Sequence, residues 1–344
     1  MNQVKTKDAV GHVLCHDITQ IVKDKVKGVA FKKGHVVKEE DIDILLSLGK
    51  DHLYVWEKKD GMLHENEAAL ILRDICKNEY MDESDIKEGK IELRASIDGL
   101  LKIDAEKLKA VNSLGEMMIA TRHQNIAVKK GDKLAGTRII PLIIEEEKMK
   151  KAKDLCGDTP ILEIKPFVNK KVGIVTTGNE VFYGRIKDTF GPVVMEKVKE
   201  FNADILGQTI VNDQAENITN AIMEFIKNGA DIVLCTGGMS VDPDDKTPKA
   251  IKDTGAEVVS YGAPVLPGAM MMLAYYKNND KFIPIIGLPG CVMYSKRTVF
   301  DLVLPRIMAD EIISRDDLSK LGLGGLCLSC DICTYPNCGF GKGV

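Results

Sequence analysis

The sequence predicts an α/β protein, in which a domain with a mostly parallel sheet follows smaller β-rich α+β regions. Between Lys171 and Lys296, three short apolar segments, KKVGIV, ADIVLC and FIPII, each end in a glycine-rich or acidic turn. Each turn precedes a segment with helical spacing, an alternation that is typical of parallel sheets. Ligands bind such sheets beyond the carboxyl ends of the strands. We therefore expect these loops to converge on one site.

The first part of the chain predicts smaller regions. Up to about residue 78, short strands alternate with one helix that ends at Gly49. Residues 88–147 contain several strand-like segments, and the charged stretch 145–158 predicts a connecting helix. Residues 160–166 predict a linker. The expected divisions are an N-terminal α+β region (1–85), a β-rich region with its connecting helix (86–160), the α/β domain (168–312) and a cysteine-rich tail (313–344).

Strands and helices alternate through the expected α/β domain. The helices that separate most of the strands provide the crossovers that parallel pairing requires. Apolar runs predict strands at 171–177, 205–211, 231–236, 256–261 and 282–287. Helical spacing predicts helices at 191–202, 214–228, 247–253 and 291–309.

Composition excludes several classes of protein. The 344 residues are 44% hydrophobic and 28% charged with a net charge of −4, which indicates a folded protein and argues against nucleic acid as the main partner. No apolar run approaches the roughly 20 residues that cross a membrane, and the first residues lack the apolar core of a signal peptide. We expect a cytoplasmic protein. All six histidines lie at or before His123, so a histidine-dependent catalytic triad confined to the α/β segment is excluded.

The glycine-rich loops predict phosphate binding. Gly237, Gly238 and Ser240 follow one strand and offer backbone N–H groups and a hydroxyl, while Gly287 and Gly290 bracket the end of another. Glycine lets the backbone approach a ligand closely, and a helix start attracts anions. The loops therefore predict an anion site.

Acidic side chains beside these donors predict a bound cation. Asp242, Asp244 and Asp245 lie in the second loop, and Glu180 lies in the first. Carboxylates repel a phosphate unless a divalent cation lies between them, and Mg²⁺ binds one or two carboxylates together with phosphate oxygens. Two alternatives remain open: the carboxylates are solvated surface, or Asp245 or Thr247 caps the following helix.

Four cysteines near the end of the chain predict a second metal centre. Cys327, Cys330, Cys333 and Cys338 form a C-x2-C-x2-C-x4-C run. Thiolates at this density bind an iron–sulfur cluster or zinc, and the overlapping spacing favours [4Fe-4S] over Zn²⁺. The alternative is a flexible tail with free thiols.

The order of the loop motifs resembles that of a known family. TTGNEV, GRIKDTFGPVV, GGMSVDPDD, APVLPGAMMM and GLPG lie in this order between Lys170 and Arg306. They resemble the molybdopterin-binding domain that molybdopterin molybdotransferases, of the MoeA and gephyrin E-domain type, share with molybdopterin adenylyltransferases of the MogA type. The resemblance implies a three-layer α/β domain that binds the phosphate of molybdopterin. For a molybdotransferase it also implies Mg²⁺-dependent insertion of molybdate or tungstate into adenylated molybdopterin, with release of AMP.

The resemblance extends to individual residues. It places Glu180 in the first ligand loop and Asp242, Asp244 and Asp245 in the second. On the hypothesis of an insertion enzyme these four residues are catalytic: Asp242, Asp244 or Asp245 holds Mg²⁺, and Glu180 orients the pterin or a metal-bound water. The resemblance implies cofactor binding by Thr177, Gly178, Asn179, Gly237, Gly238, Met239, Ser240, Pro267, Gly268, Gly287, Leu288, Pro289 and Gly290.

Several positions depart from the family pattern. Asn179 replaces an aspartate, Phe190 an asparagine, Asp242 a glycine and Ala269 a lysine. Because the missing lysine removes a cation near the phosphate, the sequence supports binding more strongly than turnover. Cys291 replaces an asparagine at an expected helix start, where a thiolate would be stabilised.

Three functions therefore stay open. The first is the insertion enzyme, and the second is a non-catalytic carrier that delivers the mature cofactor to an apo-molybdoenzyme. The third is a nucleotide pyrophosphatase of the CinA type, because the acidic PDD run of the second loop resembles the loop of that family. The resemblance also implies a homo-oligomer.

Overall fold

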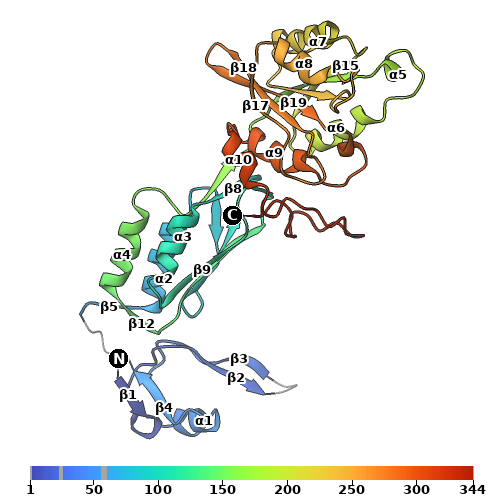
Figure 1. The fold of residues 1–344 in the computed structure, drawn as a ribbon. Helices are drawn as coiled ribbons and strands as arrows, with labels where there is room; N and C mark the ends of the chain where they lie inside the picture. The colour runs from blue at the N-terminus through green and yellow to red at the C-terminus, as the bar shows by residue number, and fades with distance from the viewer. Residues whose placement is uncertain (1, 23–25, 56–59, 344) are drawn as a thin grey trace. The chain divides into compact units, whose positions relative to one another are not determined.

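The structure is a computed structural model that describes residues 2–22, 26–55 and 60–343. The protein consists of two compact units (Figure 1). No helix in these ranges combines the length and the apolar character that a membrane crossing needs. The first unit contains the described parts of residues 1–97, 103–122 and 130–163, and the second contains residues 98–102, 123–129 and the described chain from 164 onward.

The first unit begins with a small α+β region. The helix expected before Gly49 is confirmed as α1 (Asp41–Ser47), whose Leu45 is fully buried in a small hydrophobic cluster. The strands pair antiparallel, β1 (Asn2–Lys5) with β4 (His52–Val55) and β2 (Ile18–Val22) with β3 (Val26–Phe31), and η1 (Thr6–Asp8) is a short 3-10 helix.

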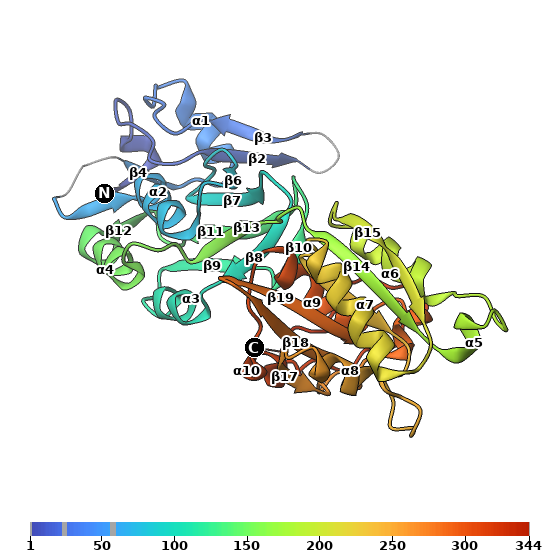
Figure 2. The same ribbon diagram turned by 90° about the horizontal axis from the view of Figure 1, so that it is seen from above.

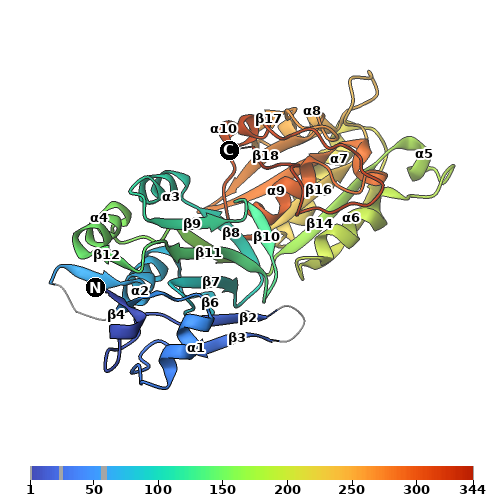
Figure 3. The same cartoon turned by 90° about the horizontal axis from the view of Figure 1, so that it is seen from below.

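The rest of the first unit is an antiparallel sheet with helices. The sheet has the strand order β6-β7-β11-β9, which can be followed in Figure 3. The connecting helix expected at 145–158 is confirmed as α4. The sequence patterns do not predict α3. Asp104 caps α3, because its carboxylate accepts the Lys107 backbone N–H at 3.0 Å. The elements are β5 (Met62–His64), α2 (Glu65–Cys76), β6 (Met81–Glu83), β7 (Lys90–Ala95), α3 (Ala105–Asn112), β9 (Met117–Thr121), β11 (Lys133–Ile139), β12 (Ile143–Glu145) and α4 (Glu146–Cys156).

A three-stranded sheet has most of its residues in the second unit. Its order is β10 (Ile126–Val128), β8 (Gly99–Ile103) and β13 (Leu162–Pro166). The linker expected at 160–166 is therefore wrong. Leu162 and Ile164 are fully buried and alternate with more exposed residues, which is the pattern of a strand with one buried face.

The main sheet of the second unit has six strands in the order β15-β14-β16-β19-β18-β17. The first four strands pair in parallel, and β18 pairs antiparallel with both β19 and β17, which confirms the mostly parallel sheet. The strands are β14 (Lys171–Thr177), β15 (Asp204–Val211), β16 (Ile232–Thr236), β17 (Glu257–Tyr261), β18 (Met272–Asn278) and β19 (Lys281–Leu288).

Helices cover both faces of this sheet, so the domain has three layers. Alternate side chains along each strand enter two separate hydrophobic clusters, one with α6 and α9 and the other with α7 and α8. Figure 2 shows α7 lying along one face. The helices are α5 (Asn179–Phe182), α6 (Phe190–Lys199), α7 (Ala215–Lys227), α8 (Thr247–Asp253), η2 (Gly290–Met293), α9 (Val299–Met308) and α10 (Arg315–Lys320).

The structure differs from the sequence-based expectations for this domain in two places. The single helix expected at 291–309 is instead a short 3-10 helix followed by α9. The break has a local cause, because Thr298 caps α9 by accepting the Phe300 N–H, while Asp301 accepts the Thr298 N–H in return. Strand β18 was not predicted, since its sequence MLAYYKN follows directly on the proline–glycine turn.

Candidate functional site

The first and second loops meet at the carboxyl ends of β14 and β16. The hydroxyl oxygens of Thr177 and Thr247 lie 3.2 Å apart, and the Thr247 hydroxyl donates to the Gly237 carbonyl at 2.9 Å. A Cβ at Gly237 would lie 2.3 Å from the Thr177 carbonyl oxygen, and Gly237 and Gly238 both have positive φ. Glycine is required here because the two loops pack backbone against backbone.

The second loop folds back on itself. The Ser240 backbone N–H donates to the Asp245 carboxylate at 2.9 Å, and the Asp245 N–H donates to the Asp242 carbonyl at 2.9 Å. The N-cap of α8 is Lys246, which makes no side-chain capping bond, so capping by Asp245 or Thr247 is not observed. Asp245 therefore shapes the loop.

A carboxylate that the sequence analysis missed joins the first loop. Asp213 follows β15 and accepts the Asn179 backbone N–H at 2.8 Å. Burial raises the pKa of Asp213 above its ordinary value, and the charges of Glu180, Asp245 and Asp244 raise it further. Asp213 thus lies within electrostatic reach of three further carboxylates at this edge of the sheet. The available signal was position, since Asp213 follows a strand that neighbours β14.

The third loop meets the second through a methionine. Met239 is 4% exposed, and a Cβ at Gly287 would lie 2.5 Å from its sulfur, so Met239 fills the space above β19. Leu288 is buried as well, as is Pro289. Gly290 is exposed, with no atom within 4 Å of an added Cβ. Of this loop, Gly290 offers the most accessible backbone.

Pro267 and Gly268 lie at the start of α9. The Pro267 carbonyl accepts the Val299 N–H at 3.1 Å, and a Cβ at Gly268 would lie 2.5 Å from a Val299 methyl group. The Gly268 carbonyl accepts the Met271 N–H at 3.1 Å. These contacts position α9. The first two loops contact each other, the first loop also contacts Asp213, and the Met239 carbonyl of the second loop accepts the Tyr261 hydroxyl at 2.8 Å.

The metal-ligand predictions stay predictions. Among residues 2–22, 26–55 and 60–343, no three histidine, cysteine, aspartate or glutamate side chains gather closely enough to hold an ion. Asp242 and Asp244 are exposed, and Cys330 and Cys333 are exposed in the tail. The thiolate stabilisation expected at Cys291 is wrong, because burial raises the pKa of the Cys291 thiol.

Two parts of the chain match known protein families. Residues 173–309 match the family described as "Probable molybdopterin binding domain". Residues 3–57 match a second family, described as a domain of unknown function. The resemblance found in the loop motifs is thereby confirmed for the α/β domain.

Two relatives illustrate how far the similarity reaches. The chain is 24% identical over 133 residues to a molybdopterin adenylyltransferase of Pyrococcus furiosus, covering 36% of this chain and 78% of the relative. It is 30% identical over 93 residues to a CinA-like protein of Mycobacterium avium, covering 27% of this chain. The match spans only 21% of the length of that CinA-like protein.

One solved structure is similar to part of this chain. The tungsten cofactor synthesizing protein MoaB from Pyrococcus furiosus is 23% identical, with a TM-score of 0.32, over 36% of this chain and 84% of that one.

Proposed function

We propose that this chain acts in molybdenum cofactor maturation as an insertion enzyme. Its α/β domain binds adenylated molybdopterin at the three loops and inserts molybdate or tungstate with Mg²⁺-dependent release of AMP. One observation carries the proposal: the glycine backbone of the second loop lies against the first loop, beside a set of interacting carboxylates that includes Asp213. The same proposal includes a homo-oligomer and an apo-molybdoenzyme that receives the product.

The donors and the carboxylates have complementary tasks. The backbone N–H groups of Gly237 and Gly238 and the hydroxyl of Ser240 bind phosphate oxygens, since glycine permits close approach. The negative charges of Glu180 and Asp244 repel the same phosphates. A bound Mg²⁺ would remove that repulsion and stabilise the charge on the leaving phosphate.

AMP release breaks the phosphoanhydride bond between the pterin phosphate and AMP. The oxygen of a water molecule attacks one of the two phosphorus atoms and forms the new P–O bond. The other phosphate leaves with the bridging oxygen and the electrons of the broken bond, and the proton that the water loses passes to a nearby carboxylate. The Glu180 side chain is exposed at the first loop and can orient that nucleophile. Asp245 supports the site indirectly, because it holds the Ser240 N–H.

Asp244 provides the direct test. Asp244→Asn removes one charge from an exposed side chain and should leave the fold intact. We expect the rate constant of AMP release to fall at least tenfold at low Mg²⁺. A single-turnover assay with adenylated molybdopterin, molybdate and purified full-length chain measures AMP and the metal retained on the pterin. Asp280→Asn is the matched control, because Asp280 lies in the turn between β18 and β19, at the opposite end of β19. Equal rates for wild type and Asp244→Asn would remove Asp244 from the mechanism.

The carrier is the second candidate, and Ala269 favours it. No lysine follows the proline–glycine turn, and the Ala269 carbonyl accepts the Ala263 N–H in a backbone turn. Tight binding of molybdopterin without release of AMP would favour the carrier over the insertion enzyme.

The similarity to CinA-like proteins keeps the nucleotide pyrophosphatase as the third candidate. The acidic second loop, with Asp242, Asp244 and Asp245, supports it as well. Release of AMP from ADP-ribose in the absence of molybdate would favour this activity.

A further inference from the structure

All four tail cysteines line one cavity of the second unit. The cavity has a volume of about 650 Å³, and its wall includes Cys327, Cys330, Cys333 and Cys338. Tyr294, Ser295, Lys296 and Arg297, from the loop after β19, complete it together with Pro267. The tail, dark red in Figure 1, thus forms a hollow against the α/β domain.

Both ends of the cysteine segment are fixed. The Cys327 N–H donates to the Leu266 carbonyl at 2.8 Å, and the Leu266 N–H donates to the Gly325 carbonyl at 2.8 Å. Phe340 is 4% exposed in the core, and the Tyr335 hydroxyl donates to the Asp301 carbonyl at 3.1 Å. Cys327 and Cys338 themselves pack against the same core. The flexible tail considered above is therefore not what the structure contains.

The middle of the segment is less enclosed. Cys330 and Cys333 are exposed, and Ser329 has φ 51°, which turns the chain between the first two cysteines. The Lys296 ammonium donates to the Asp331 carbonyl at 2.9 Å and so holds the loop between the two exposed cysteines. The sulfurs share the cavity wall, although no three of them converge in the described chain.

We propose that this cavity binds a [4Fe-4S] cluster through Cys327, Cys330, Cys333 and Cys338. Thiolates are the ligands of such clusters, and two of the four are already fixed against the core. The other two are exposed on the loop that the Lys296 ammonium holds through the Asp331 carbonyl. Cluster binding would bring the four sulfurs together and is therefore coupled to a rearrangement of this loop. Zn²⁺ would draw all four sulfurs to about 2.3 Å from a single ion, whereas the irons of a cluster take one cysteine sulfur each, which suits cysteines spread along one cavity wall.

The charges around the cavity also fit an anionic cluster. Lys296 lies over the loop of Asp331, and its positive charge offsets that of the thiolates. The Arg297 guanidinium is engaged elsewhere, since it pairs with Asp301 at 2.9 Å and lies 5.3 Å from the centre of the Tyr335 ring. Of these two cations in the cavity wall, Lys296 is therefore the one that would neutralise the charge of a bound cluster.

Iron and sulfide analysis of the anaerobically purified, full-length chain tests the proposal. We expect about four iron and four sulfide per chain after reconstitution, with visible charge-transfer absorption that dithionite bleaches. In the double variant Cys330→Ser, Cys333→Ser, iron should fall at least tenfold. Cys291→Ser is the matched control, because this cysteine lies outside the tail run, and it should retain wild-type iron.

A folding failure must be separated from loss of the site. Because Cys330 and Cys333 are exposed, the double variant should unfold at the same urea concentration as the metal-free wild type. One zinc per chain without iron would overturn the cluster assignment. So would a chain that binds no metal, or a double variant that keeps its iron. The result is independent of the AMP assay.

Discussion

Asp213 is the carboxylate of the candidate site whose ionised form is disfavoured both by burial and by neighbouring negative charges. Burial and the neighbouring Glu180, Asp245 and Asp244 raise its pKa above the ordinary value of about 3.9. Ionised Asp213 therefore costs stability at neutral pH. Below the ordinary pKa the side chain is protonated in both the folded and the unfolded state, and that cost disappears.

Asp213→Asn should stabilise the ligand-free protein at pH 7. The new amide keeps an oxygen that can accept the Asn179 N–H but removes the charge. We expect a higher urea midpoint for the variant at pH 7 and equal midpoints once the pH falls below about 4. Mg²⁺ should stabilise the wild type more than the variant.

The exposed control is Asp280→Asn, which should leave the midpoint unchanged at both pH values. If Asp213→Asn lowered the midpoint at pH 7, the view that this carboxylate is electrostatically strained would be wrong.

Residues of the site could be predicted only in part. Gly237 and Gly238 were predicted because glycine-rich or acidic turns follow three strands in succession, whereas one glycine pair alone is often only a tight turn. Met239 stands in the same motif, yet it is buried above Gly287, where it packs in the core. Asp213 carries no motif of its own, so only the pairing of β15 with β14 brings it to the site.

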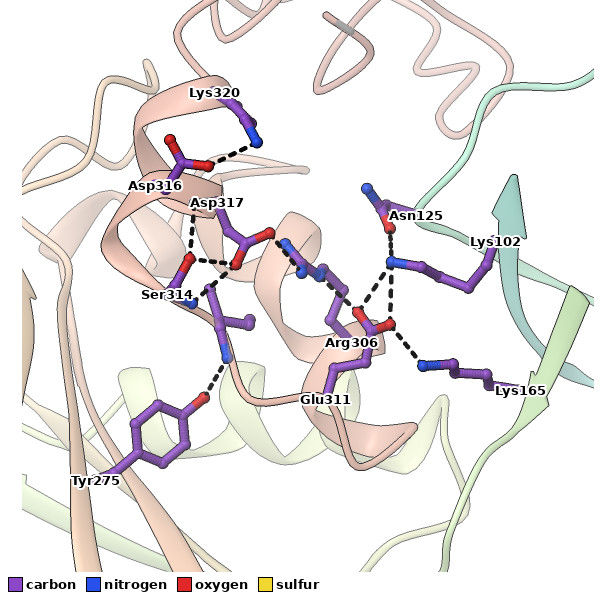
Figure 4. Close-up of polar contacts among 11 residues, drawn as sticks. Lys102, Asn125, Lys165, Tyr275, Arg306, Glu311, Ser314, Asp316, Asp317 and Lys320 are labelled. Atoms are coloured by element: carbon purple, nitrogen blue, oxygen red, sulfur yellow. Dashed lines mark hydrogen bonds and ion pairs between the residues drawn. The ribbon is translucent and has the colours of Figure 1, made fainter. Parts of the chain in front are cut away.

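At the scale of elements, one glutamate ties together four parts of the second unit (Figure 4). Glu311, between α9 and α10, accepts from Arg306 of α9 at 2.8 Å. It also pairs with Lys102 of β8 at 3.0 Å and with Lys165 of β13 at 3.1 Å. Burial acts to raise the pKa of Glu311, but the hydrogen bonds from Arg306 and Lys102 outweigh it and lower the pKa.

Glu311→Gln should destabilise the second unit by about 2–3 kcal/mol at pH 7, because three cations lose their shared anion. The folded-state pKa lies below the ordinary value of about 4.3, so the contribution of Glu311 is present above that pH. It is lost as the pH falls through the folded-state pKa, and urea unfolding at several pH values measures this.

The matched control for Glu311 is an exposed ion pair of the neighbouring helix. Asp316 and Lys320 of α10 pair at 2.6 Å with 73% and 63% of their side chains exposed. Asp316→Asn should change stability by no more than about 0.5 kcal/mol. Equal effects of the two substitutions would show that the Glu311 network is no stronger than a surface pair.

Elements were predictable where one physical signal dominated. The strands β14, β16 and β19 are apolar runs that end at glycine-rich turns, and parallel burial explains both features. The segment of β13 is short and bounded by prolines, Pro160 and Pro166, which favoured a linker. Only pairing with β8 makes it a strand, and that partner is distant in sequence.

At the scale of the whole molecule, the tail completes the core of the second unit. Phe340 is 4% exposed and belongs to the cluster that also contains Leu302 of α9, and its ring lies 6.3 Å from that of Tyr335. A Cβ at Gly341 would lie 2.3 Å from a Leu302 methyl group, so the chain passes close against α9. The last residues therefore contribute to a core that begins near residue 172.

Phe340→Ala tests whether this closure stabilises the unit. Removing a buried phenyl ring should cost about 3–5 kcal/mol, since both burial and packing are lost. Leu328→Ala is the control, because Leu328 of the same tail is 79% exposed and its loss should cost no more than about 0.5 kcal/mol. Urea unfolding followed by far-UV circular dichroism compares them. The Phe340 variant should lose both stability and iron, whereas the double cysteine variant should lose iron alone. If Phe340→Ala were as stable as Leu328→Ala, the tail would be an appendage to a core that is complete without it.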